Sequence, residues 1–146
     1  MRILFLLIFS AIFANDRSWD EKLLYSASFG GVDVATATLK SKKIKNIKNQ
    51  DILRIEFKAK SRPSLKYIFP INDKIIIDVD LDTWQPLKVE KKIREGSYKQ
   101  NSLSTFDHKN NIFIYKKDTI PYGGEIFNPY SLIYYFRTLD FSSDEN

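Results

Sequence analysis

Hydrophobic and polar residues alternate along most of the chain, which is the pattern of β-strands with one buried face. In the clearest run Leu53, Ile55 and Phe57 alternate with charged residues. Further runs of this kind cover residues 22–29, 74–82, 87–94, 98–106 and 112–115. Turn-forming residues between the runs, such as Gly30-Gly31, indicate hairpins. The pattern predicts a mainly β fold of about seven or eight antiparallel strands, curved into a partial barrel or roll.

Changes of phase in this pattern predict finer details. After Gly30-Gly31 the apolar residues move from even to odd positions, which a β-bulge near Val34-Ala35 would explain. Residues 61–72 contain two prolines and break the alternation, so we expect a loop that crosses over an edge or end of the sheet.

Two strands are expected to fold about Trp84, in a turn that the Asp82 side chain begins. This places Val79 opposite Val89 and keeps the apolar residues of both strands on one face.

The strand pattern ends before Asn128-Pro129, which are an N-cap and a first helical residue, respectively. They predict a helix over residues 130–139, apolar nearly all round and packed on the concave side of the sheet.

A ligand held between helix and sheet would contact aromatic residues of both. The candidate ligand-binding residues are Tyr25, Phe57, Tyr130, Tyr134 and Phe136. The alternative is that these aromatic residues only form part of the core.

An apolar run precedes all of these elements. Residues 3–13 contain one polar side chain, Ser10, and lie between Arg2 and Ala14. The run is shorter than the about 20 residues of a membrane-spanning helix, but it has the charged start and small-residue end of a secretory signal peptide. Ile12 stands where cleavage favours a small residue, so an uncleaved anchor is the alternative. We therefore expect export to the periplasm.

Removing a signal peptide of residues 1–14 leaves residues 15–146, the usual length of one domain. The chain is 43% hydrophobic, which is enough for a folded core. It has no cysteine, which excludes disulfides, thiolate metal sites, a cysteine nucleophile and a lipoprotein anchor.

The formal net charge is +5, with more lysine than arginine. Nucleic-acid binding is not expected, because arginines and exposed aromatic residues do not cluster in one segment. The densest basic stretch, residues 40–48, is either a solvated strand end and loop or a patch for anionic lipid or polysaccharide.

Side chains that could carry chemistry are few. The single histidine, His108, is expected to lie in a surface turn, although pairing with Asp107 as a general base is an alternative. Asp78, Asp80 and Asp82 are spaced too far apart along a strand to hold one cation, and we expect a solvated face opposite lysines of the next strand. No nucleophile elbow, metalloprotease helix or phosphate-binding loop occurs. We therefore expect no catalytic residues, no metal and no cofactor.

Several segments occur in a familiar order. They are Glu21-Lys22-Leu23-Leu24-Tyr25, Phe29-Gly30-Gly31, Asp82-Thr83-Trp84-Gln85-Pro86, Thr105-Phe106-Asp107 and residues 128–137. In this order they resemble the exported bacterial family catalogued as domain of unknown function 3108, which implies an exported β-rich protein and no established catalytic residues. Asn128 stands where Asp is commoner in that family. The family also continues with more strands, so the resemblance implies a C-terminally shortened member with an unpaired edge that favours self-association.

These observations favour a non-catalytic envelope protein that binds an envelope lipid, polysaccharide or protein, or supports its assembly. A carrier of an apolar, lipid-like ligand is the alternative, by analogy of fold alone, and an envelope hydrolase comes third. Contact with the membrane is expected only through an uncleaved signal segment.

Overall fold

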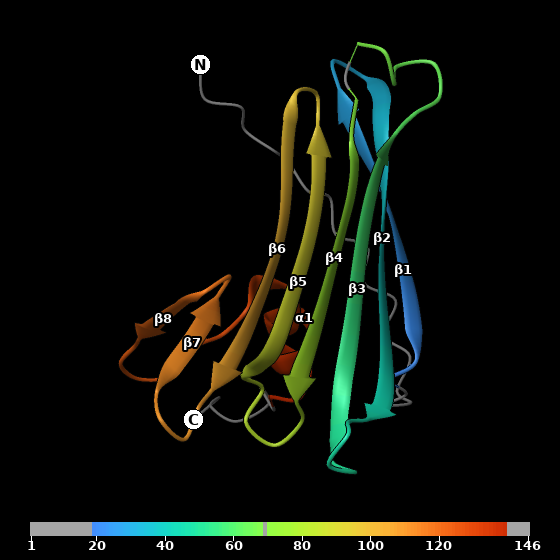
Figure 1. Cartoon of the computed structure of the whole chain (residues 1–146). Helices are drawn as coiled ribbons and strands as arrows, with labels where there is room; N and C mark the ends of the chain where they lie inside the picture. Colours follow the sequence, from blue (N-terminus) through green and yellow to red (C-terminus); the bar gives the residue numbers. More distant parts are fainter. Residues whose placement is uncertain (1–18, 69, 140–146) are drawn as a thin grey trace, which may run out of the picture.

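Eight strands form one antiparallel sheet in the computed structural model, which describes residues 19–68 and 70–139. Each strand pairs with the next one along the chain (Figure 1). The strands are β1 (Glu21–Phe29), β2 (Val32–Lys45), β3 (Asp51–Ser61), β4 (Asn72–Asp80), β5 (Pro86–Glu95), β6 (Tyr98–Asp107), β7 (Ile112–Tyr115) and β8 (Asp118–Pro121). One helix, α1 (Pro129–Phe136), follows them. The prediction of a mainly β, antiparallel fold with a C-terminal helix is confirmed.

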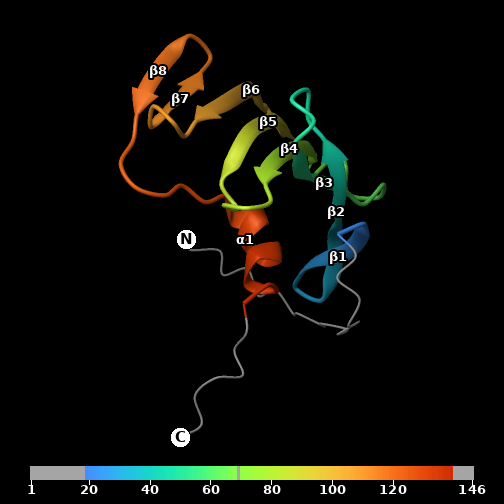
Figure 2. The same cartoon turned by 90° about the horizontal axis from the view of Figure 1, so that it is seen from below.

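The sheet is curved and open, and it does not close into a barrel. β1 and β8 are its two edges and do not pair with each other. The last two strands are only four residues long each, and they lie at the far side of the sheet from β1 (Figure 2). The predicted signal segment, residues 1–14, lies outside the described residues.

The first hairpin has the predicted two-residue turn and bulge. Phe29 pairs with Val32 around Gly30-Gly31, and both glycines have the positive φ that this turn requires. Ser28 pairs with Asp33 while Ala27 pairs with Ala35, which leaves Val34 as the extra residue.

The β4–β5 register differs by two residues from the predicted one. Val89 lies opposite Ile77, not Val79, and Val79 lies opposite Pro86 after an irregularity in the pairing. A shift of two residues leaves every side chain on its face, so the alternation of the sequence cannot distinguish the two registers.

The turn between these strands decides their register. It is organised by Asp80 rather than by the predicted Asp82, because one Asp80 carboxylate oxygen accepts hydrogen bonds from the backbone N–H groups of Asp82 and Thr83, both at 2.9 Å. Trp84 completes the turn with a positive φ of 60°.

The long connection of residues 62–71 stays at one end of the sheet. It joins the neighbouring strands β3 and β4, so of the two predicted positions, an edge or an end of the sheet, the connection takes the end. Hydrogen bonds from Arg62 N–H to Val34 and from Gly96 N–H to Pro70 tie it to the hairpins on either side.

α1 lies on the concave face of the sheet and covers the half of that face away from the 62–71 connection (Figures 1 and 2). Buried side chains of the four central strands pack beneath it. These are Leu39, Leu53, Ile55, Ile75, Ile77, Val79 and Val89, joined by Trp84 and Tyr134. No helix among the described residues is long and apolar enough to span a bilayer.

Candidate functional site

The helix begins where the sequence predicts. The Asn128 side chain accepts a hydrogen bond from the Tyr130 N–H at 3.0 Å, and Pro129 occupies the first turn. The Ser131 hydroxyl donates to the Asn128 carbonyl oxygen at 2.9 Å. This start fixes the face of α1 that meets the sheet, on which Ser131 and Tyr134 are fully buried.

Phe57 of β3 and Tyr130 of α1 are the closest pair among the predicted ligand-binding residues. Their ring centroids are 4.9 Å apart, with the planes inclined by 33°. Burial raises the pKa of Tyr130, and the negative charge of Asp73 raises it further. The two rings therefore pack on each other at the N-terminal end of the helix.

Tyr134 is the most deeply buried of the five, with 0% of its surface exposed. Its hydroxyl makes no hydrogen bond with the described residues. The nearby Ser41 hydroxyl lowers the Tyr134 pKa, but it donates to the Trp19 carbonyl oxygen at 2.6 Å and does not reach hydrogen-bonding geometry with Tyr134. Burial dominates and raises the pKa of Tyr134 to about 12.

Tyr25 and Phe136 have different surroundings. Tyr25 is partly buried against the same core, and burial followed by the charge of Glu21 raises its pKa. Phe136 is 51% exposed and has a ring contact with Tyr135, at 6.0 Å between centroids. The fold thus brings Tyr25, Phe57, Tyr130 and Tyr134 to one core, whereas Phe136 lies at its margin.

A second group of aromatic side chains packs around Trp84 and Tyr135, and sequence reasoning did not identify it. Trp84 lies 5.3 Å from Trp19 and 6.0 Å from Tyr135, measured between ring centroids, and Phe127 stacks on Tyr135 at 5.7 Å. Trp84 was expected only as a turn residue. The size of the Trp84 side chain could have indicated this contact, because a tryptophan in a turn still has a large apolar surface to bury.

His108 lies in the β6–β7 turn, as predicted, but it is half-buried and both of its ring nitrogens have partners. Its Nε2 lies 2.7 Å from the Pro86 carbonyl oxygen, and its Nδ1 lies 2.6 Å from the Tyr122 hydroxyl oxygen. Because a carbonyl only accepts, Nε2 carries the proton and Nδ1 accepts from Tyr122 in the neutral ring. Asp107 instead accepts hydrogen bonds from the backbone of Lys109 and Asn110, and the pairing of Asp107 with His108 as a general base does not form.

Two of the three aspartates expected on a solvated face are buried. Asp78 lies under Arg54, which donates two hydrogen bonds to it at 2.7 and 2.8 Å, and Asp80 organises the β4–β5 turn. Only Asp82 is exposed. The expectation of a solvated row is therefore wrong for Asp78 and Asp80, because side chains beside them on the same face cover their carboxylates. No group of three or more His, Asp or Glu residues in the described chain could hold a metal ion.

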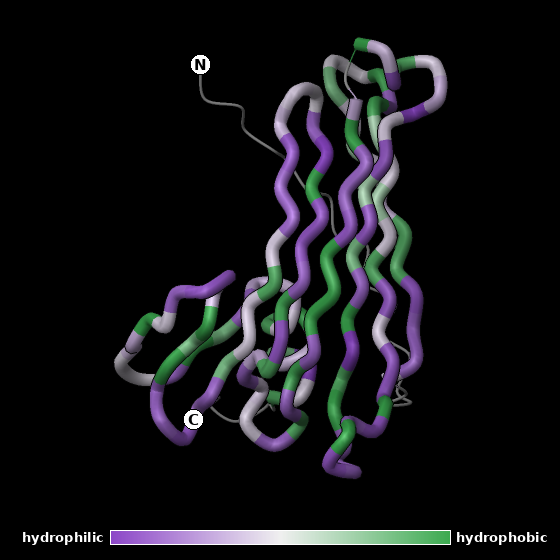
Figure 3. Tube along the Cα trace, viewed as in Figure 1, coloured by the Kyte–Doolittle hydropathy of each residue, from purple (hydrophilic) through white to green (hydrophobic). Residues whose placement is uncertain are grey.

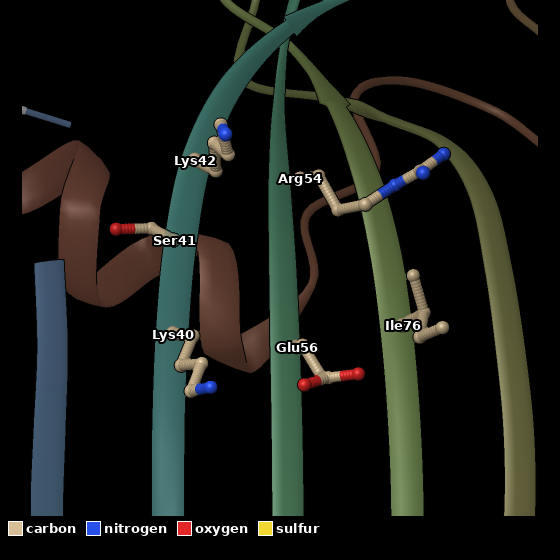
Figure 4. A pocket seen from close by; sticks show the side chains of 6 residues that line it. All are labelled: Lys40, Ser41, Lys42, Arg54, Glu56 and Ile76. Carbon is tan, nitrogen blue, oxygen red and sulfur yellow. The ribbon is translucent and has the colours of Figure 1, made fainter. Parts of the chain in front are cut away.

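The face opposite the helix carries a shallow hollow of about 230 Å³. In Figure 4 the side chains of Lys40, Lys42, Arg54 and Glu56 stand on this outer face, whereas Ser41 points to the helix side. Glu56 is engaged by Lys58 at 2.7 Å and by a second lysine, Lys74, at 3.2 Å.

These observations define a class of protein: a single open antiparallel sheet whose concave face holds one helix and whose outer face is charged. The model of a family described as a protein of unknown function, DUF3108, matches residues 24–144. The chain belongs to this family, as its sequence motifs indicated. Comparisons with curated proteins and with solved structures gave no match.

Proposed function

We propose that this protein is a non-catalytic component of the cell envelope that binds an envelope component, or supports its assembly, through its surface. The observation that carries the proposal is the filled contact between helix and sheet. Tyr134 and Ser131 are fully buried there, and the rings of Phe57 and Tyr130 pack on each other. Such an interior favours an interaction module over a carrier, because the aromatic side chains occupy the space that a ligand would need. Export rests on the signal pattern of residues 1–14.

The chemistry of the polar side chains also supports a non-catalytic role. Both ring nitrogens of His108 have structural partners, and Asp78 and Asp80 are held by Arg54 and by a turn. A hydrolase needs a base within reach of a nucleophile or a bound water. Here these groups are committed to holding strands and turns together.

A lipid carrier is the second candidate, favoured by the part of the concave face that the helix leaves uncovered. Small side chains line this part, and they lie in register across three strands: Ala37 pairs with Ala59, and Ala27 pairs with Ala35. Tyr25 lies beside them, opposite Ala37. An apolar chain lying across this part of the face would contact Ala37, Ala59 and Tyr25.

Native mass spectrometry of the protein purified from the periplasm tests both candidates. If the protein is an interaction module, the measured mass should be that of the protein alone or of its complex with a macromolecular partner. A stoichiometric lipid that is lost in Ala59→Phe but retained in Thr38→Phe would replace the first proposal by the carrier. Ala59 lies on the concave face beyond the helix, and Thr38 lies on the opposite face of the sheet. Absence of the protein from the periplasm would overturn the envelope role.

A further inference from the structure

One end of the sheet carries a group of exposed apolar side chains that the proposed function does not use. Five large side chains there are more than half exposed. They are Phe29 and Val32 of the β1–β2 hairpin, Tyr67 and Ile68 of the β3–β4 connection, and Tyr98 of the β5–β6 hairpin. We call these five residues the apolar tip. Figure 3 shows hydrophobic residues between hydrophilic ones along the β3–β4 connection at the top of the view.

The three connections that carry the apolar tip are held together. Arg62 donates to Asp33 at 3.0 Å and its N–H to the Val34 carbonyl oxygen at 2.9 Å, which joins the β3–β4 connection to the first hairpin. Gly96 N–H donates to the Pro70 carbonyl oxygen at 2.8 Å, which joins the same connection to the β5–β6 hairpin. The apolar tip is therefore presented as one unit.

The opposite end of the sheet provides an internal comparison. Its connections cover residues 46–50, 81–85 and 108–111 and are mostly polar. Among their described side chains, Ile47 alone is a large apolar residue with high exposure. Turns are normally polar, and a gathering of exposed apolar side chains marks an interaction site.

Positive charge surrounds the apolar tip. The cations at this end are Lys60, Arg62, Lys66, Arg94 and Lys99, and the carboxylates are Asp33, Asp73 and Glu95. Asp33 and Arg62 neutralise each other, and Asp73 is buried, so the exposed charges that remain are mostly positive. Lys66 lies over the Tyr67 ring, with its Nζ 4.8 Å from the centroid.

The excess of positive charge continues on the outer face. Lys74 lies directly opposite Lys58 on one side and Lys92 on the other. Lys58 and Lys74 both pair with Glu56, so these three lysines have one carboxylate between them and the row keeps a net positive charge that favours an anionic partner.

We propose that the apolar tip docks the protein on the surface of an anionic lipid bilayer. Aromatic and aliphatic side chains would enter the interfacial region, where such residues partition favourably, and the surrounding lysines and arginines would meet the phosphate groups. The side chains project from three separate turns, which suits insertion between lipids better than contact with a flat protein surface. This inference does not rest on the helix–sheet contact that carries the proposed function, since none of the five residues belongs to the core beneath α1.

Sedimentation with vesicles tests the docking. Vesicles of phosphatidylethanolamine and phosphatidylglycerol should bind the full chain, and vesicles of phosphatidylcholine alone should bind it more weakly because each interfacial lysine adds to binding only on an anionic surface. The double variant Tyr67→Ser/Ile68→Ser should bind about tenfold more weakly. The matched control is Ile47→Ser, which removes an exposed apolar residue at the opposite end. Both variants keep residues 1–18, so any contribution of the predicted signal segment is the same.

A labelling experiment reports which end meets the lipid. The chain has no cysteine, so Tyr67→Cys and Ile47→Cys each accept one environment-sensitive fluorophore. Emission should shift to shorter wavelength with anionic vesicles for the label at position 67 but not for the label at position 47. Soluble glycerophosphate should not displace the protein, which distinguishes a bilayer from free phosphate.

The proposal is overturned if the double variant binds as well as Ile47→Ser, or if both kinds of vesicle bind the chain equally. It is also overturned if the double variant changes the mass of the protein in solution rather than its vesicle binding, because the apolar tip would then join two copies of the chain. Tyr67 is 85% exposed and Ile68 68% exposed, so the double variant should keep the circular dichroism spectrum and thermal midpoint of the parent.

Discussion

Replacement of Tyr134 by phenylalanine is expected to stabilise the protein. The Tyr134 hydroxyl is buried and has no hydrogen bond with the described residues. A buried polar group without a partner costs about 1–3 kcal/mol relative to the solvated group. Tyr134→Phe removes this cost and keeps the aromatic ring in the core cluster, which also contains Leu39 and Ile55. We expect the free energy of unfolding to rise by about 1 kcal/mol near neutral pH.

The same substitution should change how stability depends on pH. The pKa of Tyr134 is raised from 10.0 to about 12 in the folded protein, chiefly by burial. Above pH 10 the unfolded chain releases this proton while the folded protein retains it, so stability falls as pH rises toward 12. A shift of this size amounts to roughly 2–3 kcal/mol. Phenylalanine has no such proton, so the advantage of Tyr134→Phe should widen across this range.

Urea titration at about pH 8 and at about pH 11 measures both effects as shifts in the unfolding midpoint. Tyr25→Phe is the matched control, because this tyrosine is only partly buried, and its effect near neutral pH should stay within about 0.5 kcal/mol. A Tyr134→Phe protein that is less stable than the parent near neutral pH would refute the reasoning, since it would mean that the hydroxyl has a hydrogen bond. If the difference in unfolding free energy between Tyr134→Phe and the parent does not grow with pH, the raised pKa assigned to Tyr134 is refuted.

Arg54→Met should lower the free energy of unfolding by about 1–2 kcal/mol, because Asp78 stays buried without its two hydrogen bonds; an unchanged urea midpoint would show that water replaces them. Asn128→Ala should cost about 1 kcal/mol in the same assay through loss of the helix cap. Asn128→Asp should retain the cap, so an equal loss of stability in both variants would contradict the capping role of this side chain. Mass spectrometry of protein from the periplasm should show a chain that begins at Asn15, whereas retention of residues 1–14 would support the uncleaved anchor.

Local patterns in the sequence were sufficient to predict the elements of the fold except β8 (Asp118–Pro121), over which no run was recognised. The alternation of apolar residues located the strands, Gly30-Gly31 located a turn, and the change of phase located the bulge at Val34. Asn128-Pro129 located the start of the helix. The helix ends at Phe136, before the predicted residue 139, and continues only as tighter turns in which Arg137 N–H bonds to the Tyr134 carbonyl oxygen.

Long-range relations were beyond these patterns. Alternation assigns a side chain to a face but does not say what covers it, so the burial of Asp78 beneath Arg54 could not be foreseen. Closure of the sheet depends on whether β1 and β8 meet, which no local signal reports. In the candidate site, the aromatic residues of the helix were predictable from their spacing. The exposure of Phe136 was not, because it depends on how far the helix extends over the sheet.

The strictly sequential order of the strands has a consequence for the kinetics of folding. Each strand finds its partner in the adjacent stretch of chain, so the sheet can grow hairpin by hairpin with little loop-closure entropy at any step. The helix is different, because its end meets β1 through Arg137 and Glu21, which are 116 residues apart. We therefore expect the strands to pair first, one hairpin after another, and α1 to dock late, when it brings residues 21 and 137 together.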